Sequence, residues 1–338
     1  MAVAWTKIAG GGCVTQFDVT LAGEANLDLL LYGLPEELPL ERELIADRMA
    51  MTLGGSPAIT AHNLAALGSR TGFITSSAGD LFSSICLKEL AEAGVNLSRI
   101  VRTEDGGSAG ISVLLQHLHS RRTFTYRGTT HDLRFEDLDL DYLTAARHFH
   151  LSSYFLQEHL RKDVPRLFVH LKRAGLTISL DPNDDPSGSW DESLFEALKH
   201  VDVFLPNERE VCHLMRESDP GHAIRRLGER LPLLVVKRGS RGAVAVRNGV
   251  RFEAEAIQVE SVDAVGAGDS FNAGFLHAFL KDWPLEGCLH FGNLTGAFST
   301  TAQGGVQAFR DRGRLDSFIA SLMQEIGRSY GCEDGIFL

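Results

Sequence analysis

Cysteine is scarce in this chain and occurs in no closely spaced pair. The 338 residues include five cysteines that are scattered without a CxxC motif, namely Cys13, Cys86, Cys212, Cys288 and Cys332. Disulfide-based scaffolds need many cysteines within a short chain, so this class is excluded. Scattered cysteines are typical of reduced thiols, and we expect a soluble protein of the cytoplasm.

The chain also lacks a surplus of positive charge and a long apolar run. Its formal net charge is −11, and Lys and Arg form only short groups, which argues against a nucleic-acid partner. No stretch of about 18 uncharged apolar residues occurs, and the N-terminus has no signal-peptide pattern. We therefore expect no membrane partner, and an anionic ligand would need a local binding site.

The residues that are present suit one large α/β domain. The sequence is 44% hydrophobic and 23% charged, and short apolar runs alternate with amphipathic stretches such as residues 83–94 and 163–175. The runs that we interpret as strands are residues 19–25, 71–77, 148–153, 176–183, 201–207 and 232–239. This alternation predicts a doubly wound, mostly parallel sheet with helices on both faces.

Two segments depart from the alternation. About residues 29–52 are rich in Pro, Leu and Glu, and about residues 107–130 alternate around a turn near Ser120. Both patterns favour β structure outside the main sheet, so we expect these segments to form a small β lid. A separate hairpin is indicated by Asn248-Gly249, a pair that suits a type I′ turn.

The two ends of the chain fall outside these patterns. The triple glycine at residues 10–12 is followed by no helical pattern, which favours a flexible segment over a phosphate-binding loop. We expect three regions: a flexible N-terminal extension over residues 1–16, the α/β domain over 17–325 and a C-terminal tail over 326–338.

Polar residues gather where the expected strands end. Four successive strand ends carry them, in the order Asp181 and Asn183, Asn207 and Glu210, Lys237 and Gly239, and finally Gly266 to Asp269 beyond the hairpin. Ligands of open parallel sheets bind at the carboxyl ends of the strands. Acids, amides, a lysine and glycines at one edge therefore predict a single site for a polyanion and a metal ion.

The segment SVDAVGAGDSFNAGF, residues 261–275, carries the most specific signal. Small residues from Gly266 to Gly268 precede a helix whose apolar face includes Phe271 and Phe275. Backbone amides at a helix N-terminus can bind negative charge without a cationic side chain. Asp269 in that first turn is placed as a general base for phosphoryl transfer, and the alternative is that it caps the helix.

Within this segment, DAVGAGDSFNAGF resembles the C-terminal signature of the PfkB, or ribokinase-like, family of carbohydrate kinases. Further matches follow the family's order, covering about residues 20 to 310: GEANLDLLL, GGSPA, LDPN, NEREV, KRGSRG and GNLTGAFSTTAQGG. The resemblance implies a kinase that depends on ATP and Mg²⁺ and phosphorylates a primary hydroxyl of a small sugar or sugar acid. It also implies a homodimer, because lids of this family often pair across a two-fold axis.

The resemblance assigns a role to each matching residue on the nucleotide side. Asp269 would take the proton of the sugar hydroxyl, while Gly266, Ala267 and Gly268 would form an anion hole for the transferring phosphoryl group. Glu210 would act on Mg²⁺ through water, and Asp263 marks the place of a monovalent-cation site, with potassium activation as an option. The residues implied at the nucleotide are Asn183, Asn207, Lys237, Gly239, Gly242 and Asn293.

The sugar side matches less closely. The resemblance places Asn26 and Asp28 at the substrate, together with Gly54 and Gly55 where backbone must approach it. Ile59 stands where the family usually has a sugar-binding asparagine. Asn63 lies four residues further on the same helical face and could substitute for it, although a capping or exposed role is the ordinary alternative.

Two further positions bear on an acidic substrate. Several relatives carry an arginine where this chain has Asp185, so one anchor for a substrate phosphate or carboxylate is missing. Tyr126 and Arg127 resemble the lid segment that reaches the sugar acid in 2-keto-3-deoxygluconate kinases. The alternative is that Arg127 is a solvated surface group.

Two other functions remain open from the sequence. A nucleoside kinase of the same family would share the fold and Asp269. A non-catalytic sensor of sugars or nucleotides is disfavoured, because such a binder has no need of the base at Asp269. His148 and His150 alternate on one strand face, but no third ligand has a spacing that would make them a metal site.

Overall fold

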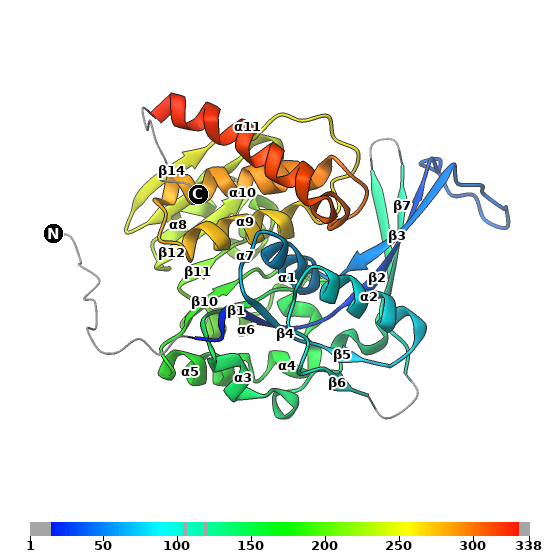
Figure 1. The fold of residues 1–338 in the computed structure, drawn as a ribbon, viewed down its shortest axis with the longest axis horizontal. Helices are drawn as coiled ribbons and strands as arrows, with labels where there is room; N and C mark the ends of the chain where they lie inside the picture. Colours follow the sequence, from blue (N-terminus) through cyan, green and yellow to red (C-terminus); the bar gives the residue numbers. More distant parts are fainter. Residues whose placement is uncertain (1–14, 104–106, 118–119, 331–338) are drawn as a thin grey trace.

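A central sheet of eight strands forms the middle layer of the computed structural model, which describes residues 15–103, 107–117 and 120–330 (Figure 1). In spatial order its strands are β14 (Val250–Ala254), β13 (Ala243–Arg247), β12 (Leu233–Lys237), β11 (Val203–Phe204), β10 (Thr177–Leu180), β9 (Ala146–Leu151), β1 (Phe17–Ala22) and β4 (Thr71–Ile74). Neighbours from β4 to β12 are parallel, and the β13–β14 hairpin adds an antiparallel edge. The expected mostly parallel sheet is confirmed.

Alternate side chains of these strands face two separate cores. On β12, Leu234 and Val236 pack into one core, whereas Leu233 and Val235 pack into the other. A strand covered on both faces reads as an unbroken apolar run, as this one does. The first core lies under α3 (Leu140–Thr144), α4 (Glu158–Arg161), α5 (Val164–Arg173), α6 (Ser193–Leu198), α7 (Glu208–Met215) and α8 (Pro220–Gly228). The second lies under α1 (Ser56–Ala66), α2 (Leu81–Glu92), α9 (Ala267–Phe279), α10 (Leu285–Thr300) and α11 (Arg312–Tyr330).

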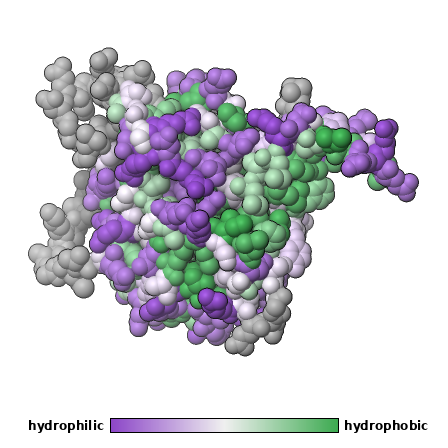
Figure 2. All heavy atoms as spheres, turned by 45° about the vertical axis from the view of Figure 1, so that its right-hand side comes forward, coloured by the Kyte–Doolittle hydropathy of each residue, from purple (hydrophilic) through white to green (hydrophobic). Residues whose placement is uncertain are grey.

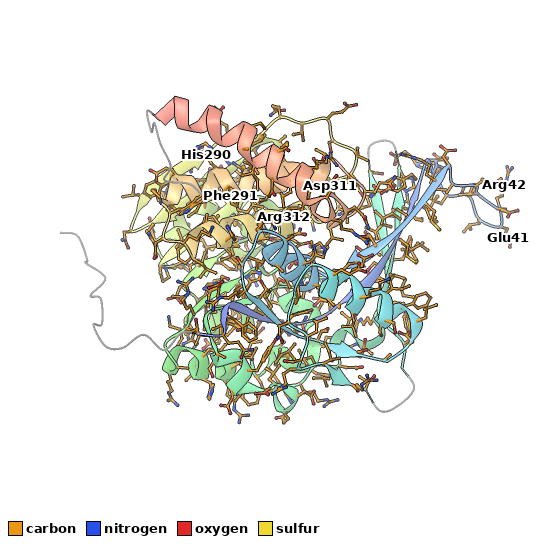
Figure 3. All side chains as sticks on the ribbon, viewed as in Figure 1. Glu41, Arg42, His290, Phe291, Asp311 and Arg312 are labelled. Carbon is orange, nitrogen blue, oxygen red and sulfur yellow. The ribbon has the colours of Figure 1, made fainter. Side chains whose placement is uncertain are left out.

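A second sheet of four strands, called the small sheet here, stands apart from the central one at the right of Figure 1. In spatial order it contains β3 (Arg48–Gly54), β2 (Asn26–Tyr32), β7 (Ile111–Gln116) and β8 (Arg121–Tyr126). The two segments that depart from the α/β alternation thus supply one sheet. The loop between β2 and β3 extends far from the body and carries Glu41 and Arg42 (Figure 3).

Some local features were also open to prediction. Asn248 and Gly249 have positive φ angles of 52° and 76°, as a type I′ turn requires. Helix α11 continues past residue 325, where we expected the domain to end. Most of the expected N-terminal extension and the end of the tail lie outside the described residues. Within the part of the chain that is described, no helix has the length and apolar character needed to cross a membrane.

Candidate active site

The N-terminus of α9 forms a turn that suits an anion. Gly266 caps this helix with a φ of 72°, and a Cβ atom added to it would lie 2.4 Å from the Cα atom of Gly305. Only glycine fits a left-handed position so close to a neighbouring backbone. The first amides of an α-helix have no intrahelical acceptor and lie at the positive end of its dipole. The backbone from Gly266 to Asp269 therefore presents a favourable environment for negative charge.

Asp269 lies in the first turn of α9 and contacts a different helix. The hydroxyl of Ser56, at the start of α1, donates a hydrogen bond to Oδ1 of Asp269. The cap of α9 is a glycine and no side chain caps the helix, so the alternative that Asp269 serves as the cap is not supported. Burial raises the pKa of Asp269 to about 7, although hydrogen bonds from Ser56 and Asn183 favour its ionised form. A carboxyl that titrates near neutral pH is suited to general-base chemistry.

An ion pair links the carboxyl ends of β12 and β10. Nζ of Lys237 donates to Oδ2 of Asp181, and Nδ2 of Asn272 donates to the same oxygen at 2.5 Å. Burial opposes the charged form of Lys237, but the carboxylates of Asp181 and Glu210 outweigh it and raise the pKa of the lysine. A Cβ atom on Gly268 would lie 3.7 Å from Nζ of Lys237, so the charged amine is held beside the anion-binding turn.

Asn207 and Glu210 form a capping box at the start of α7. Oδ1 of Asn207 accepts from the amide of Glu210 at 2.9 Å, and Oε2 of Glu210 accepts from the amide of Asn207 at 2.8 Å. Burial, together with the nearby Asp181 carboxylate, raises the pKa of Glu210. Among the described residues, no three His, Cys, Asp or Glu side chains group into a metal cage. The arrangement fits Mg²⁺, which keeps several of its waters and binds through one or two carboxylates.

A pocket of about 370 Å³ adjoins this cluster, between the end of β12 and helices α9 and α10. Its lining includes six residues expected near the nucleotide and the anion hole: Lys237, Gly239, Gly242, Ala267, Gly268 and Asn293. Nδ2 of Asn293 donates to the carbonyl oxygens of Ala254 and Glu255 at 3.1 and 2.9 Å, so this residue holds the pocket wall in place. Asn183 is absent from the lining and lies beside Asp269 instead.

Asp28 faces the anion-binding turn from strand β2 of the small sheet. Its side chain is buried, and a Cβ atom on Gly54 would lie only 2.0 Å from Oδ1 of Asp28. Gly54 is thus required by the carboxylate that packs on it. Burial raises the pKa of Asp28 to about 7, and the carboxylate of Asp269 adds to this shift. Gly55 caps α1 with a φ of 88°, close to the carbonyl oxygen of Glu24.

Two asparagines expected at the sugar are used inside the protein. Asn63 is fully buried, and its Nδ2 donates to Oγ of Ser270 at 2.9 Å and to the carbonyl oxygen of Gly305 at 3.0 Å. Both donated hydrogen bonds of Asn63 go to α9 and to the loop at Gly305, which does not favour the alternative that Asn63 takes the place of the sugar-binding asparagine. Asn26 is also buried, and its Oδ1 accepts from the hydroxyl of Thr130 at 2.8 Å.

Ile59 lies beneath the anion-binding turn. Its side chain is buried, and Cδ1 would lie 3.4 Å from a Cβ atom on Gly266 and 2.8 Å from one on Gly305. An apolar residue suits this position because it is packed between two glycine backbones. The position at which the family resemblance leads us to expect an asparagine is thus part of the core here.

Arg127 and Asp185 both have partners within the protein. Arg127 follows β8, and its guanidinium pairs with the carboxylate of Glu158 at 2.5 Å while about half of its side chain stays exposed. Asp185 is buried and accepts hydrogen bonds from the amides of Ser187 and Trp190 at 2.9 and 2.7 Å. The half-exposed guanidinium of Arg127 is accessible to a ligand. The carboxylate of Asp185 instead stabilises the loop that contains it.

Sequence reasoning missed a buried acid beside the site. Nε2 of Gln157 donates to Oε2 of Glu24, and burial raises the pKa of Glu24 to about 7. Ser153 and Asn183 have left-handed φ angles of 55° and 53°, and Oδ1 of Asn183 accepts from the amide of Ser153 at 2.8 Å. The spacing of Glu24, four residues before Asp28 in the same segment, was the available signal.

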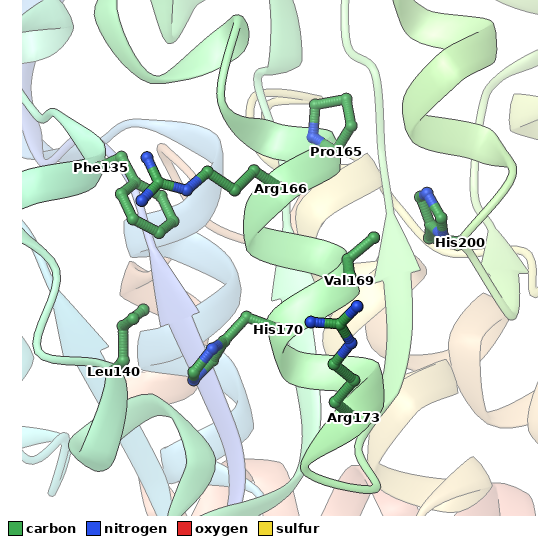
Figure 4. A pocket seen from close by; sticks show the side chains of 8 residues that line it. All are labelled: Phe135, Leu140, Pro165, Arg166, Val169, His170, Arg173 and His200. Carbon is green, nitrogen blue, oxygen red and sulfur yellow. The ribbon is translucent and has the colours of Figure 1, made fainter.

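The other prominent features lie away from these groups. A pocket of about 430 Å³ lies on the outer side of α5, where the guanidinium of Arg166 lies 4.0 Å from the ring centroid of Phe135 (Figure 4). None of its lining residues belongs to the cluster described above. His148 and His150 are buried and bind the hydroxyl of Ser179 at 2.7 Å each, and burial lowers the pKa of both to about 3. They are neutral polar groups of the core.

Comparisons with known proteins bear on the family and the fold of the chain. The family model for pfkB family carbohydrate kinases matches residues 17–311. A fructokinase from Salmonella typhimurium is 30% identical over 305 residues, which cover 86% of this chain and 95% of that protein. A 2-dehydro-3-deoxygluconokinase from Bacillus subtilis is 27% identical and covers 80% and 87%. A solved structure of a provisional ribokinase II from E. coli, in complex with ATP and Mg²⁺, has a TM-score of 0.80 at 25% identity and covers 90% and 99%.

Proposed function

The chain belongs to the pfkB family of carbohydrate kinases, and we propose that it transfers the γ-phosphate of ATP to a primary hydroxyl of a small sugar or sugar acid. Asp269 is the general base that takes the proton of the attacking hydroxyl. The amides at Gly266, Ala267 and Gly268 stabilise the charge on the phosphoryl group in transit. Asp28, with the backbone at Gly54 and Gly55, holds the acceptor.

The placement of Asp269 carries this proposal. It lies at the junction of three features: the anion-binding turn, the pocket lined by Lys237, and the carboxylate of Asp28 on the small sheet. A base between a phosphate-binding turn and a hydroxyl-binding acid has the arrangement that in-line phosphoryl transfer requires. A screen of sugars, sugar acids and nucleosides for ATP turnover tests the proposal, and turnover of nucleosides alone would replace it with a nucleoside kinase.

We place the nucleotide in the pocket of about 370 Å³. Its apolar lining suits an aromatic base, and Lys237 and the turn at Gly268 lie at the phosphate end. When bound, Mg²⁺ neutralises charge on the phosphates, and Glu210 and Asn207 are the residues placed to hold it through water. A monovalent cation at Asp263 is not part of the proposal, because both oxygens of that carboxylate accept hydrogen bonds from the protein.

The charge of the acceptor is open to a direct test at Arg127. If the substrate is a sugar acid, Arg127→Ala should raise its KM by about tenfold or more and leave the KM of a neutral sugar unchanged, because the lost charge-assisted contact acts on the carboxylate alone. Steady-state kinetics with one sugar acid and one neutral sugar measure this. Equal effects on both substrates would remove the sugar-acid option and leave Arg127 as the partner of Glu158.

A homodimer through the small sheet is the second part of the proposal. One row of directly paired residues on the outer face is entirely apolar and runs across all four strands: Met51, Leu29, Val113 and Phe124. Met51 and Phe124 are exposed, and Figure 2 shows apolar side chains on this side of the molecule. A second copy of the same face would cover it with two-fold symmetry.

Phe124→Glu should convert this dimer into a monomer, because a carboxylate would be buried without a partner within the interface. Light scattering coupled to size exclusion should then give a mass near 36.9 kDa instead of twice that value. Val250→Glu, on exposed strand β14 at the edge of the other sheet, is the matched control and should remain dimeric. A wild-type protein that is monomeric at micromolar concentration would end the dimer proposal.

A further inference from the structure

The carboxylate of Asp263 is saturated by donors from the protein itself. Oδ2 accepts from the hydroxyl of Tyr32 at 2.9 Å and from the amide of Gly304 at 3.0 Å. Oδ1 accepts from the amide of Val265 at 3.0 Å and from Nε2 of Gln116 at 3.3 Å. Each oxygen thus has two hydrogen bonds, which matches the acceptor capacity of a carboxylate.

These donors belong to two different parts of the molecule. Tyr32 and Gln116 end the neighbouring strands β2 and β7 and face each other in register, so both side chains come from the small sheet. Val265 and Gly304 belong to the loops that support the anion-binding turn. Asp263 is therefore a bridge between the small sheet and the start of α9.

An apolar contact follows the same path. Val265 is buried in a small core cluster with Leu30, Tyr32 and Leu114, all from the inner face of the small sheet. Val265 directly precedes Gly266, the cap of α9. The small sheet thus contacts the chain immediately before the anion-binding turn in two ways. It packs against the side chain of Val265, and it donates hydrogen bonds to the carboxylate of Asp263.

The bridge through Asp263 constrains the distance between Asp28 and Asp269, the two carboxylates of the proposed reaction. Asp28 and Tyr32 lie on one strand and, four residues apart, on one face of it. Asp263 and Asp269 lie on the continuous segment that leads into α9. A hydrogen bond from Tyr32 to Asp263 therefore sets how far Asp28 stands from Asp269, and so how an acceptor hydroxyl meets the base.

We propose that Asp263 is a positioning residue that ties the small sheet to the anion-binding turn through the protein's own donors, and that this tie replaces the monovalent cation which the family resemblance suggests at this position. A cation needs lone pairs that point to it, whereas donor hydrogens surround both oxygens here. The inference rests on the proposed kinase function for its kinetic test and on the hydrogen bonds alone for its stability test.

The ion test compares KCl, NaCl and choline chloride at equal ionic strength with MgATP and a sugar that is turned over. We expect kcat/KM to agree among the three salts within about threefold, and a larger stimulation specific to K⁺ would overturn the inference. Thermal unfolding in KCl and in choline chloride gives a readout without activity. The midpoints should coincide, and a rise specific to K⁺ would show a bound ion. Absence of turnover with every substrate would count against the proposed function, and the unfolding midpoints would then decide the inference.

The tie itself is tested with Tyr32→Phe, which removes only the donor hydroxyl. One lost charge-assisted hydrogen bond should lower kcat/KM for the sugar by about tenfold in every salt, while the KM for ATP stays unchanged. Tyr142→Phe is the matched control. Tyr142 lies on α3, outside the site, and its buried hydroxyl donates to the carbonyl oxygen of Asn96 at 2.8 Å. The control should lose stability and keep its kcat/KM. If both variants lose stability and keep kcat/KM, Asp263 is structural only and the inference fails.

Gln116→Leu removes the second donor of the small sheet and keeps the side-chain size. We expect a fall in kcat/KM in the same direction as for Tyr32→Phe, again without a change in the KM for ATP. If either variant is too unstable to assay, the other provides the kinetic test. Wild-type kinetics in both variants would overturn the positioning role.

Discussion

Asp269→Asn is expected to lower kcat by about 10²–10⁴-fold, which is the usual contribution of a general base. The amide keeps the size of the side chain and can still contact Ser56, so the fold and the KM for ATP should change little. Steady-state kinetics with a saturating sugar and MgATP measure this effect. Asp219→Asn is the control, since Asp219 caps the distant helix α8 and asparagine caps equally well.

The raised pKa of Asp269 also leads to an expected dependence of kcat/KM on pH. Burial raises the pKa of Asp269 to about 7, and only the deprotonated form can accept a proton. The kcat/KM of the wild type should therefore fall as the pH drops below about 7 and level off above it. Asp28 titrates in the same range, so the profile of the Asp269→Asn variant is compared to remove that contribution. Near wild-type turnover by Asp269→Asn would contradict both the mechanism and the placement of the active site.

Asp28→Ala should lower kcat/KM for the sugar by about 10²-fold or more and leave ATP binding intact. A carboxylate that accepts from two sugar hydroxyls contributes two charge-assisted hydrogen bonds, each of which corresponds to about tenfold or more. Kinetics with varied sugar and an independent measurement of ATP affinity separate the two effects. A parallel loss of ATP affinity would identify Asp28 as a residue needed for folding.

Gly54→Ala should reproduce the effect of Asp28→Ala without removing the acid. The new methyl group would lie 2.0 Å from Oδ1 of Asp28, so the carboxylate must leave its position. Gly313→Ala is the matched control, because its added methyl group would meet Oδ1 of Asp311 at 3.6 Å, an ordinary contact distance. Wild-type sugar kinetics in Gly54→Ala would show that the acceptor does not depend on where Asp28 stands.

The architecture could be predicted from local patterns of the sequence. Residues 233–236 read as an unbroken apolar run because alternate residues face two cores, and Asn248-Gly249 fixes the β13–β14 hairpin through backbone geometry alone. The small-residue turn at Gly266 was visible for the same reason, since a positive φ beside another backbone leaves glycine as the only choice.

The contacts between elements could not be predicted in this way. Helical spacing correctly placed Asn63 on the face of Ile59, but it could not tell that this face meets α9 and the carbonyl oxygen of Gly305. The bond from Ser56 to Asp269 joins two helices that are far apart in sequence. Such partners depend on the packing of whole elements, which no short motif records.

The close contact between Gly266 and Gly305 means that substitutions in these two distant segments constrain each other during evolution. A side chain added at either position would clash with the other glycine's backbone or with the buried Ile59. Relatives that carry a larger residue at position 305 should therefore carry a smaller one at position 59. Covariation among positions 59, 266 and 305 would then record the shape of this contact in sequences whose structures have not been determined.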